Sequence, residues 1–297
     1  MLENLQTVNQ EFPWFFQITI FIFGSIVGSF LNVCIYRIPA KKSVVYPGST
    51  CGCGKAIAPY DNIPILSWFI LRGKARCCGQ SYSIRYPLVE ALTGILFLLA
   101  WLEYPPLKAG AIMFFASLLI CAAFIDFDTM EIPDRFSLGT AFLGFCVSIG
   151  VPQLHGYASG SFADDAIHSA ITSILGILIG SGFILWLGLT AEAILRKDAM
   201  GFGDVKLLGG IGAFIGWQGA IFSLFGGAVI GTIGLLTWVL VKPFLKQNKT
   251  DEPEETQSLV GQRTPFGPML ASGALVHTLF LEKEVNDYFQ LVIDLMW

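Results

Sequence analysis

Two aspartates in this sequence lie beside long apolar segments, where carboxylates are rare. Asp126 directly follows the apolar run that ends at Ile125, and Asp204 follows the segment Gly201-Phe202-Gly203. A carboxylate inside a membrane helix costs about 2.5–3.5 kcal/mol on insertion scales, so such residues usually serve a function. Two aspartates close together share a proton, and one then activates a water while the other, protonated, polarises a carbonyl. This is the chemistry of an aspartic protease, although a proton relay in a transporter would use the same residues.

The other acids near Asp126 are interpreted as interfacial or helix-capping residues. Asp128 lies about 200° further around a helix than Asp126, because each residue turns the helix by about 100°, and it therefore faces elsewhere. Pro133 suits the first turn of the following helix, and Asp134 then has a favourable position near its N-terminus. Glu131 is interpreted in the same way.

The composition is that of an integral membrane protein. Charged residues make up 13% of the 297 residues and hydrophobic residues 54%, with a mean hydropathy of +0.65, whereas globular proteins have roughly 25% charged residues. This composition disfavours nucleic-acid binding, disorder and a secreted disulfide scaffold. We expect an all-α fold, because about 20 apolar residues cross a bilayer as a helix. The candidate spans are 14–35, 86–102, 109–125, 136–151, 167–191, 205–241 and 265–281.

The segment 205–241 is too long for one crossing, since a single tilted helix accepts roughly 25 residues. Trp217-Gln218-Gly219 supplies a plausible turn, so we predict two crossings here and about eight transmembrane helices in total. With eight spans, one side carries sixteen of the eighteen basic residues, leaving Lys108 and Lys283 opposite. Positively charged loops stay in the cytoplasm, so both termini are expected outside it. The sixteen are Arg37, Lys41, Lys42, Lys55, Arg72, Lys74, Arg76, Arg85, Arg135, Arg196, Lys197, Lys206, Lys242, Lys246, Lys249 and Arg263.

The predicted domain organisation has four parts. Residues 1–36 form the first transmembrane helix, and residues 37–85 form a cytoplasmic insert with four cysteines. Residues 86–281 form the remaining membrane core, which includes a polar cytoplasmic linker at 243–264. Residues 282–297 form an amphipathic tail that could lie along the outer membrane surface.

Both aspartates lie in short motifs, Ile125-Asp126 with Ile132-Pro133-Asp134 and then Gly201-Phe202-Gly203-Asp204-Val205-Lys206. These motifs resemble the bacterial type IV prepilin peptidases, a family of GxGD-type intramembrane aspartyl proteases. A single GxGD is weak evidence, whereas an ordered set of motifs over about 240 residues is strong. The other matching segments are Gly28-Ser29-Phe30-Leu31-Asn32-Val33, Tyr36-Arg37-Ile38-Pro39, Asn62-Ile63-Pro64-Ile65-Leu66-Ser67-Trp68, Leu71-Arg72-Gly73-Lys74, Arg85-Tyr86-Pro87-Leu88-Val89-Glu90 and Pro265-Phe266-Gly267-Pro268.

The resemblance implies that Asp126 and Asp204 are the catalytic pair, with Gly201, Gly203 and Lys206 supporting the catalytic loop. It implies cleavage of type IV prepilins and type II secretion pseudopilin precursors at the cytoplasmic face of the inner membrane, after a glycine that ends a basic leader. Many members of the family also methylate the new N-terminal residue with S-adenosylmethionine.

The cofactor site has no local signature. Gly201-Phe202-Gly203 is not a dinucleotide-binding fingerprint, because no strand precedes it. Asn62, Arg85 and Glu90 are candidate cofactor ligands between the insert and the cytoplasmic helix ends, although residues of this kind more often anchor loops.

The cysteines of the insert depart from the family pattern. Many members carry two CxxC pairs suited to tetrahedral zinc, whereas this chain has Cys51-Gly52-Cys53 and Cys77-Cys78. The side chains of adjacent cysteines diverge, so converging both on one ion requires a distorted backbone. Two interpretations stay open: the four thiolates bind zinc, or they are reduced thiols that only pack.

Two other functional classes would each use part of these residues. A proton-coupled transporter would use Asp126 and Asp204 as a relay, but such transporters usually show internal repeats and carboxylates at the membrane midplane. A zinc-binding assembly scaffold would depend on residues 37–85 alone and would leave both aspartates unexplained. The oligomeric state is not predicted.

Overall fold

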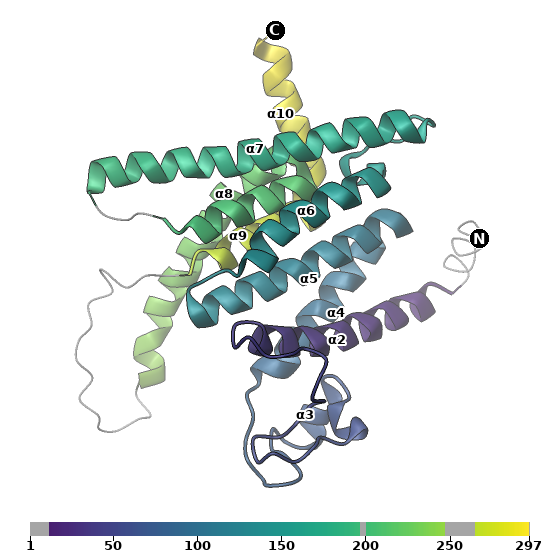
Figure 1. The fold of residues 1–297 in the computed structure, drawn as a ribbon, viewed down its shortest axis with the longest axis vertical. Helices are drawn as coiled ribbons and strands as arrows, with labels where there is room; N and C mark the ends of the chain where they lie inside the picture. Colours follow the sequence, from purple (N-terminus) through teal and green to yellow (C-terminus); the bar gives the residue numbers. More distant parts are fainter. Residues whose placement is uncertain (1–11, 197–199, 247–264, 297) are drawn as a thin grey trace. The chain divides into compact units, whose positions relative to one another are not determined.

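The computed structural model describes residues 12–196, 200–246 and 265–296 (Figure 1). Within these ranges the chain is helical and contains no strand, only two isolated β-bridges, which join Thr50 to Ala56 and Lys74 to Ser81. The expectation of an all-α fold is therefore confirmed. The chain divides into two compact units: residues 1–125 with 147–169, and residues 126–146 with 170–297.

In the first unit, helix α2 (Pro13–Arg37) packs against helix α4 (Arg85–Glu103) at glycines. A Cβ atom on Gly28 would lie 2.8 Å from the Cα of Glu90, and one on Gly24 would lie 2.9 Å from the Cα of Gly94. Any larger side chain at these positions would push the helices apart. The two contacts fix an antiparallel register, in which the Asn32 side chain donates to the backbone carbonyl of Tyr86 at 3.1 Å.

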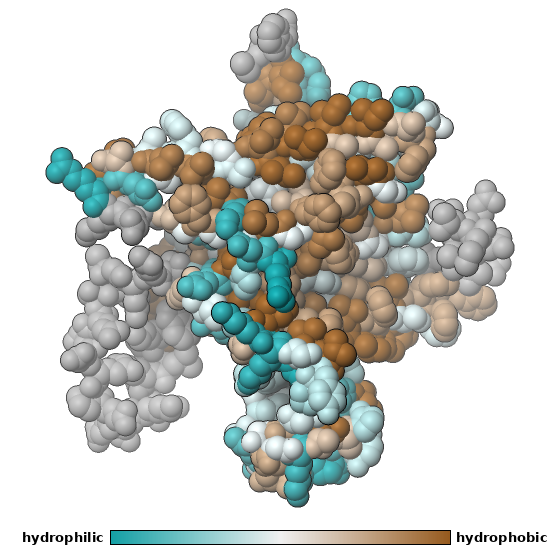
Figure 2. Space-filling model, in the orientation of Figure 1, coloured by the Kyte–Doolittle hydropathy of each residue, from teal (hydrophilic) through white to brown (hydrophobic). Residues whose placement is uncertain are grey.

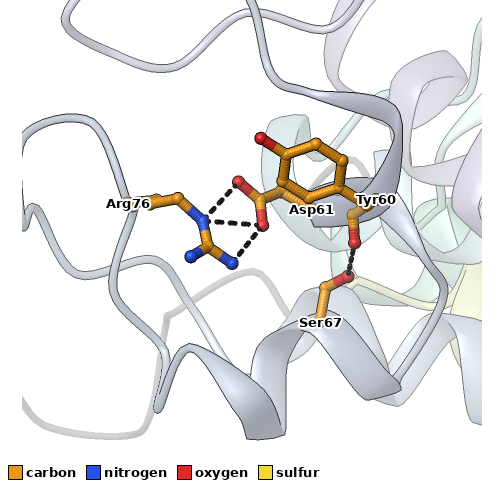
Figure 3. A network of polar contacts seen from close by, with 4 residues as sticks. All are labelled: Tyr60, Asp61, Ser67 and Arg76. Atoms are coloured by element: carbon orange, nitrogen blue, oxygen red, sulfur yellow. Dashed lines mark hydrogen bonds and ion pairs between the residues drawn. The ribbon is translucent and has the colours of Figure 1, made fainter.

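The insert between α2 and α4 contains the short helices η1 (Pro59–Asn62) and α3 (Leu66–Ile70). Arg76 makes an ion pair with Asp61 at 2.8 Å, and the hydroxyl of Ser67 donates to the carbonyl of Tyr60 (Figure 3). The indole of Trp68 donates to the carbonyl of Tyr82. These contacts fold the insert largely without a hydrophobic core of its own.

Three helices contribute residues to both units: α5 (Pro106–Thr129), α6 (Asp134–Gly150) and α7 (Phe162–Leu195). A short helical turn, η2 (Pro152–His155), follows α6. Hydrophobic side chains cover much of the visible surface along α7, as the brown band in Figure 2 shows. Exposed apolar side chains on a long helix are expected where lipid replaces water.

In the second unit, α8 (Phe202–Lys246) is interrupted at Gly216, whose backbone (φ 72°, ψ 176°) is not helical. The part before the break, 202–215, contains 14 residues and is about 21 Å long at 1.5 Å per residue. The predicted turn at Trp217-Gln218-Gly219 therefore lies one residue beyond the actual break. Glycine is required at the break because a positive φ is costly for other residues.

The chain ends in a continuous helical segment. It begins with α9 (Gly267–Val276), passes through a π-helical turn, η3 (His277–Leu281), and continues as the amphipathic helix α10 (Glu282–Met296). The helix predicted at the tail is thus present as α10. Most of the predicted linker 243–264 lies outside the described residues, and its first four residues continue α8.

Five helices of the described residues are long and apolar enough to cross a membrane: α2, α4, α5, α7 and α8. Helix α6, with 17 residues, and α9, with 10, are shorter. The chain is therefore a multi-pass membrane protein. The total of eight crossings stays a prediction.

Candidate active site and cysteine cluster

Asp126 is buried near the end of α5 and is held by the first residue of α9. Its side chain is only 5% exposed, and its Oδ2 accepts a hydrogen bond from the backbone N–H of Gly267 at 2.9 Å. A Cβ atom on Gly267 would lie 2.7 Å from the same oxygen. Only glycine therefore permits this approach, and the contact joins segments 141 residues apart.

Asp204 lies in the first turn of α8, in the same unit as Asp126. Its backbone N–H donates to the carbonyl of Gly201 at 3.1 Å, which closes the turn that starts the helix. The side chain is partly buried and lies within electrostatic range of the Asp126 carboxylate. The two aspartates singled out from sequence are therefore neighbours in the fold.

Ile132 is a neighbour of both aspartate-bearing segments that the sequence did not identify as a site residue. A Cβ atom on Gly203 would lie 3.4 Å from the Cβ of Ile132, and one on Gly267 would lie 3.1 Å from its Cδ1. The residue thus packs against the starts of α8 and α9 at once. The sequence signal that could have identified Ile132 is its place in the Ile132-Pro133-Asp134 motif. For Gly267 the corresponding signal is the motif Pro265-Phe266-Gly267-Pro268.

Lys206 forms an ion pair with Asp134, its Nζ lying 2.6 Å from Oδ1. Asp134 begins α6, as predicted, but it also ties that helix to the first turn of α8. The side chains are 33% and 67% exposed, so the pair contributes at most about 1 kcal/mol. Asp128 and Glu131 are exposed, in keeping with their interpretation as interfacial acids.

The four cysteines of the insert converge despite their unusual spacing. All four Sγ atoms lie within 4.8 Å of one another, with Cys51 to Cys78 at 3.5 Å and Cys53 to Cys77 at 3.4 Å. Four sulfurs bound tetrahedrally at about 2.3 Å from zinc would be about 3.8 Å apart. The donor set and its spacing therefore fit a metal ion.

Two tight turns bring the thiols together. Each cysteine pair is followed by a glycine with positive φ, Gly54 (83°) and Gly79 (71°). The N–H of Gly54 donates to the carbonyl of Cys51, and the N–H of Gly79 donates to that of Ala75. This backbone geometry overcomes the divergence expected of adjacent cysteines.

The thiols also perturb one another's protonation. The pKa of Cys51 is lowered to about 7, because the backbone N–H of Cys53 and the thiols of Cys77 and Cys78 donate to its sulfur. The pKa of Cys77 is raised to about 12, because its proton is shared with Cys51 and Cys53. The cluster favours one thiolate surrounded by thiols, and a cation would displace the remaining protons.

Of the three candidate cofactor ligands, two make hydrogen bonds within the fold and one is exposed. The guanidinium of Arg85 donates to the carbonyl of Phe124 at 3.2 Å and lies over its ring. Glu90 is buried and accepts the backbone N–H of Ile65 at 2.7 Å. Asn62 is exposed at the end of η1. Their role as ligands of S-adenosylmethionine stays a prediction.

The chain is a multi-pass membrane protein, helical throughout the described residues, in which two separate helix ends bring two aspartates together. Residues 22–104 match the bacterial peptidase A24 N-terminal domain, and residues 113–236 match the type IV leader peptidase family. No solved structure matches the chain.

Curated relatives match nearly the whole chain. A prepilin leader peptidase/N-methyltransferase of Pectobacterium carotovorum subsp. carotovorum is 33% identical over 92% of this chain and 96% of its own length. A protein of the same name from Myxococcus xanthus is 33% identical over 80% of this chain and 68% of its own length. A type 4 prepilin-like proteins leader peptide-processing enzyme of Escherichia coli is 32% identical over 93% of this chain and 97% of its own length. The chain therefore belongs to the type IV leader peptidase family, and it is an enzyme of the inner membrane.

Proposed function

We propose that this chain is an intramembrane aspartyl endopeptidase that cleaves the basic leader of type IV prepilins and type II secretion pseudopilins. The observation that carries the proposal is the pairing of Asp126 and Asp204, from helix ends 78 positions apart, within one compact unit. The relatives act, by their names, on prepilins or prepilin-like proteins. A transporter has no comparable support.

In the proposed mechanism the two carboxylates hold one proton and one water between them. The ionised aspartate takes a proton from the water, which attacks the carbonyl carbon of the scissile peptide. The protonated aspartate donates its proton to the carbonyl oxygen, which gives a tetrahedral gem-diol. The aspartate that took the proton from the water then passes it to the leaving amine nitrogen as the C–N bond breaks, and the other aspartate regains a proton from a hydroxyl of the gem-diol. The N–H of Gly267 orients Asp126 for this reaction by fixing Oδ2.

The site is proposed to open at the cytoplasmic face, where a basic leader would approach. Sixteen of the eighteen Lys and Arg residues share one side in the eight-span arrangement, with both termini on the other. The break at Gly216 supports this arrangement, because it divides α8 into the two crossings that the charge distribution requires.

Methylation of the new N-terminus with S-adenosylmethionine is proposed as a second activity. It is supported by the names of the Pectobacterium and Myxococcus relatives. Asn62, Arg85 and Glu90 stay the candidate ligands, and Arg85 and Glu90 also make structural contacts with Phe124 and Ile65.

The insert is proposed to bind one structural zinc ion through Cys51, Cys53, Cys77 and Cys78. The spacing of the sulfurs supports tetrahedral coordination. The alternative, four reduced thiols that only pack, is disfavoured because three of them are exposed.

The test is incubation of the detergent-purified enzyme with a prepilin, followed by mass spectrometry of the product. We expect a new N-terminus directly after the leader glycine, with a mass increase of one methyl group if the second activity is present. Asp126→Asn and Asp204→Asn should abolish cleavage, whereas the control Asp128→Asn should retain it. An inactive Asp128→Asn variant would move the first catalytic role to that residue.

A further inference from the structure

Helix α3 presents an apolar face that the rest of the insert does not cover. Leu66, Phe69 and Ile70 are 58%, 63% and 71% exposed. Their spacing of i, i+3 and i+4 places them on one face of the helix. The opposite face is fixed by Ser67 and Trp68, which hydrogen-bond within the insert. Three large apolar side chains side by side on a small polar module require a partner.

The depth of α3 relative to the membrane helices follows from one hydrogen bond. Ile65, the residue before α3, donates its backbone N–H to Glu90, and Glu90 lies five residues into α4. Five residues correspond to about 7.5 Å along the helix. Ile65 therefore lies not beyond the end of α4 but alongside it.

The depth of Ile65 in the membrane can be inferred from the length of α4. Helix α4 has 19 residues, or about 28 Å, close to the roughly 30 Å of the hydrocarbon core. Its first residue, Arg85, must then lie near the edge of that core. The start of α3 is consequently at the level of the lipid headgroups or just below them.

The charge of the insert matches an anionic lipid surface. Residues 37–85 contain eight Lys or Arg and a single acidic residue, Asp61, for a net charge of +7. Asp61 is already paired with Arg76. Arg72 and Lys74, which directly follow α3, are exposed. Basic side chains next to an apolar helix face are typical of segments that bind anionic membranes.

We propose that α3 is an interfacial anchor, which inserts Leu66, Phe69 and Ile70 into the membrane that α2 and α4 cross and places Arg72 and Lys74 among anionic headgroups. The anchor would hold the insert against the bilayer and keep it from rotating about its two connections to α2 and α4. This role does not depend on the proposed catalytic chemistry.

The test uses the full chain in vesicles of phosphatidylethanolamine and phosphatidylglycerol. Phe69 is replaced by the photoreactive p-benzoylphenylalanine, and the adducts formed under light are identified by mass spectrometry. Tyr46, an aromatic residue of the same insert that is 80% exposed, is the matched control position. We expect lipid adducts at position 69 to exceed those at position 46 by about fivefold or more, because Phe69 belongs to the proposed anchor, whereas the loop of Tyr46 is tied to Arg37, the last residue of α2. Equal yields at both positions, or adducts at 69 to protein instead of lipid, would overturn the proposal.

Two further measurements test the basic residues and the depth of α3 separately, and the second does not use the photoreactive side chain. With Arg72→Glu and Lys74→Glu in the labelled chain, adduct yield should fall in phosphatidylglycerol vesicles but not in pure phosphatidylcholine. In the unmodified chain, amides 66–72 should exchange hydrogen more slowly in bilayer nanodiscs than those of the exposed loop 43–48. Rapid exchange in both segments would contradict membrane insertion even if a variant failed to fold.

Discussion

The paired aspartates and the cysteine cluster are built in opposite ways. The aspartate pair joins the end of α5, the start of α8 and the start of α9, so its longest contact spans 141 residues. The cysteine cluster uses two tight turns whose thiols are 27 residues apart at most. A site assembled by helix packing depends on the whole unit, whereas a site assembled by local turns depends on a few backbone bonds. The two sites should therefore respond differently to single substitutions.

The largest effect is expected at the aspartates themselves. Asp126→Asn and Asp204→Asn should each reduce cleavage by about 1,000-fold or more, and the double variant should be no slower than either single one, because the residues act as a unit. Rates of prepilin cleavage in detergent measure this. Additive losses would indicate that the two carboxylates work independently.

A methyl group at Gly267 should damage the aspartate site almost as severely. Gly267→Ala would place a Cβ atom against Oδ2 of Asp126 and displace the carboxylate, and a shift of about 1 Å costs roughly 100-fold in rate. The matched control is Gly182→Ala on α7, where a Cβ atom meets nothing within 4 Å. Equal cleavage rates in both variants would contradict the claim that close packing of Gly267 positions Asp126.

A smaller loss of cleavage rate is expected when the exposed ion pair between Lys206 and Asp134 is removed. Lys206→Met and Asp134→Asn should each slow cleavage by only about twofold to fivefold, because an exposed pair contributes at most about 1 kcal/mol. The double variant should match either single one. A loss of 100-fold in the lysine variant alone would instead give Lys206 a role in the reaction.

The smallest effect on peptide cleavage is expected at the cysteines. Cys51→Ser or chelation should reduce bound zinc from about one ion per chain to well below one and make the insert sensitive to protease, while cleavage stays within about twofold because the turns fold locally. Metal analysis and limited proteolysis measure this, with Cys146→Ser as the control. Unchanged zinc content in Cys51→Ser would contradict the tetrahedral site.

Features that depend only on residues adjacent along the chain could be predicted from the sequence. Apolar runs predicted the long helices, and Asp126 and Asp204 stood out because acids are costly in such runs. The turn in the longest run was placed at Trp217-Gln218-Gly219 instead of Gly216, because glycines are frequent there and local composition does not identify the one with positive φ.

Other features could not be read from the sequence because their partners are distant. Sequence motifs make Arg85 and Glu90 candidate cofactor contacts, and only the fold shows that these residues also contact Phe124 and Ile65. The irregular cysteine spacing leaves both a zinc site and packed thiols open, and only the positive φ of Gly54 and Gly79 explains how the thiols converge.

Long apolar helices, two exceptional acids and four cysteines in one insert can be read from the amino-acid sequence. Hydrophobicity and residue chemistry are local properties that a linear chain displays directly. Tertiary structure alone decided that Gly267 holds Asp126, that Lys206 meets Asp134 and that α3 lies beside α4. These contacts form only when packed helices bring distant backbones within hydrogen-bond distance.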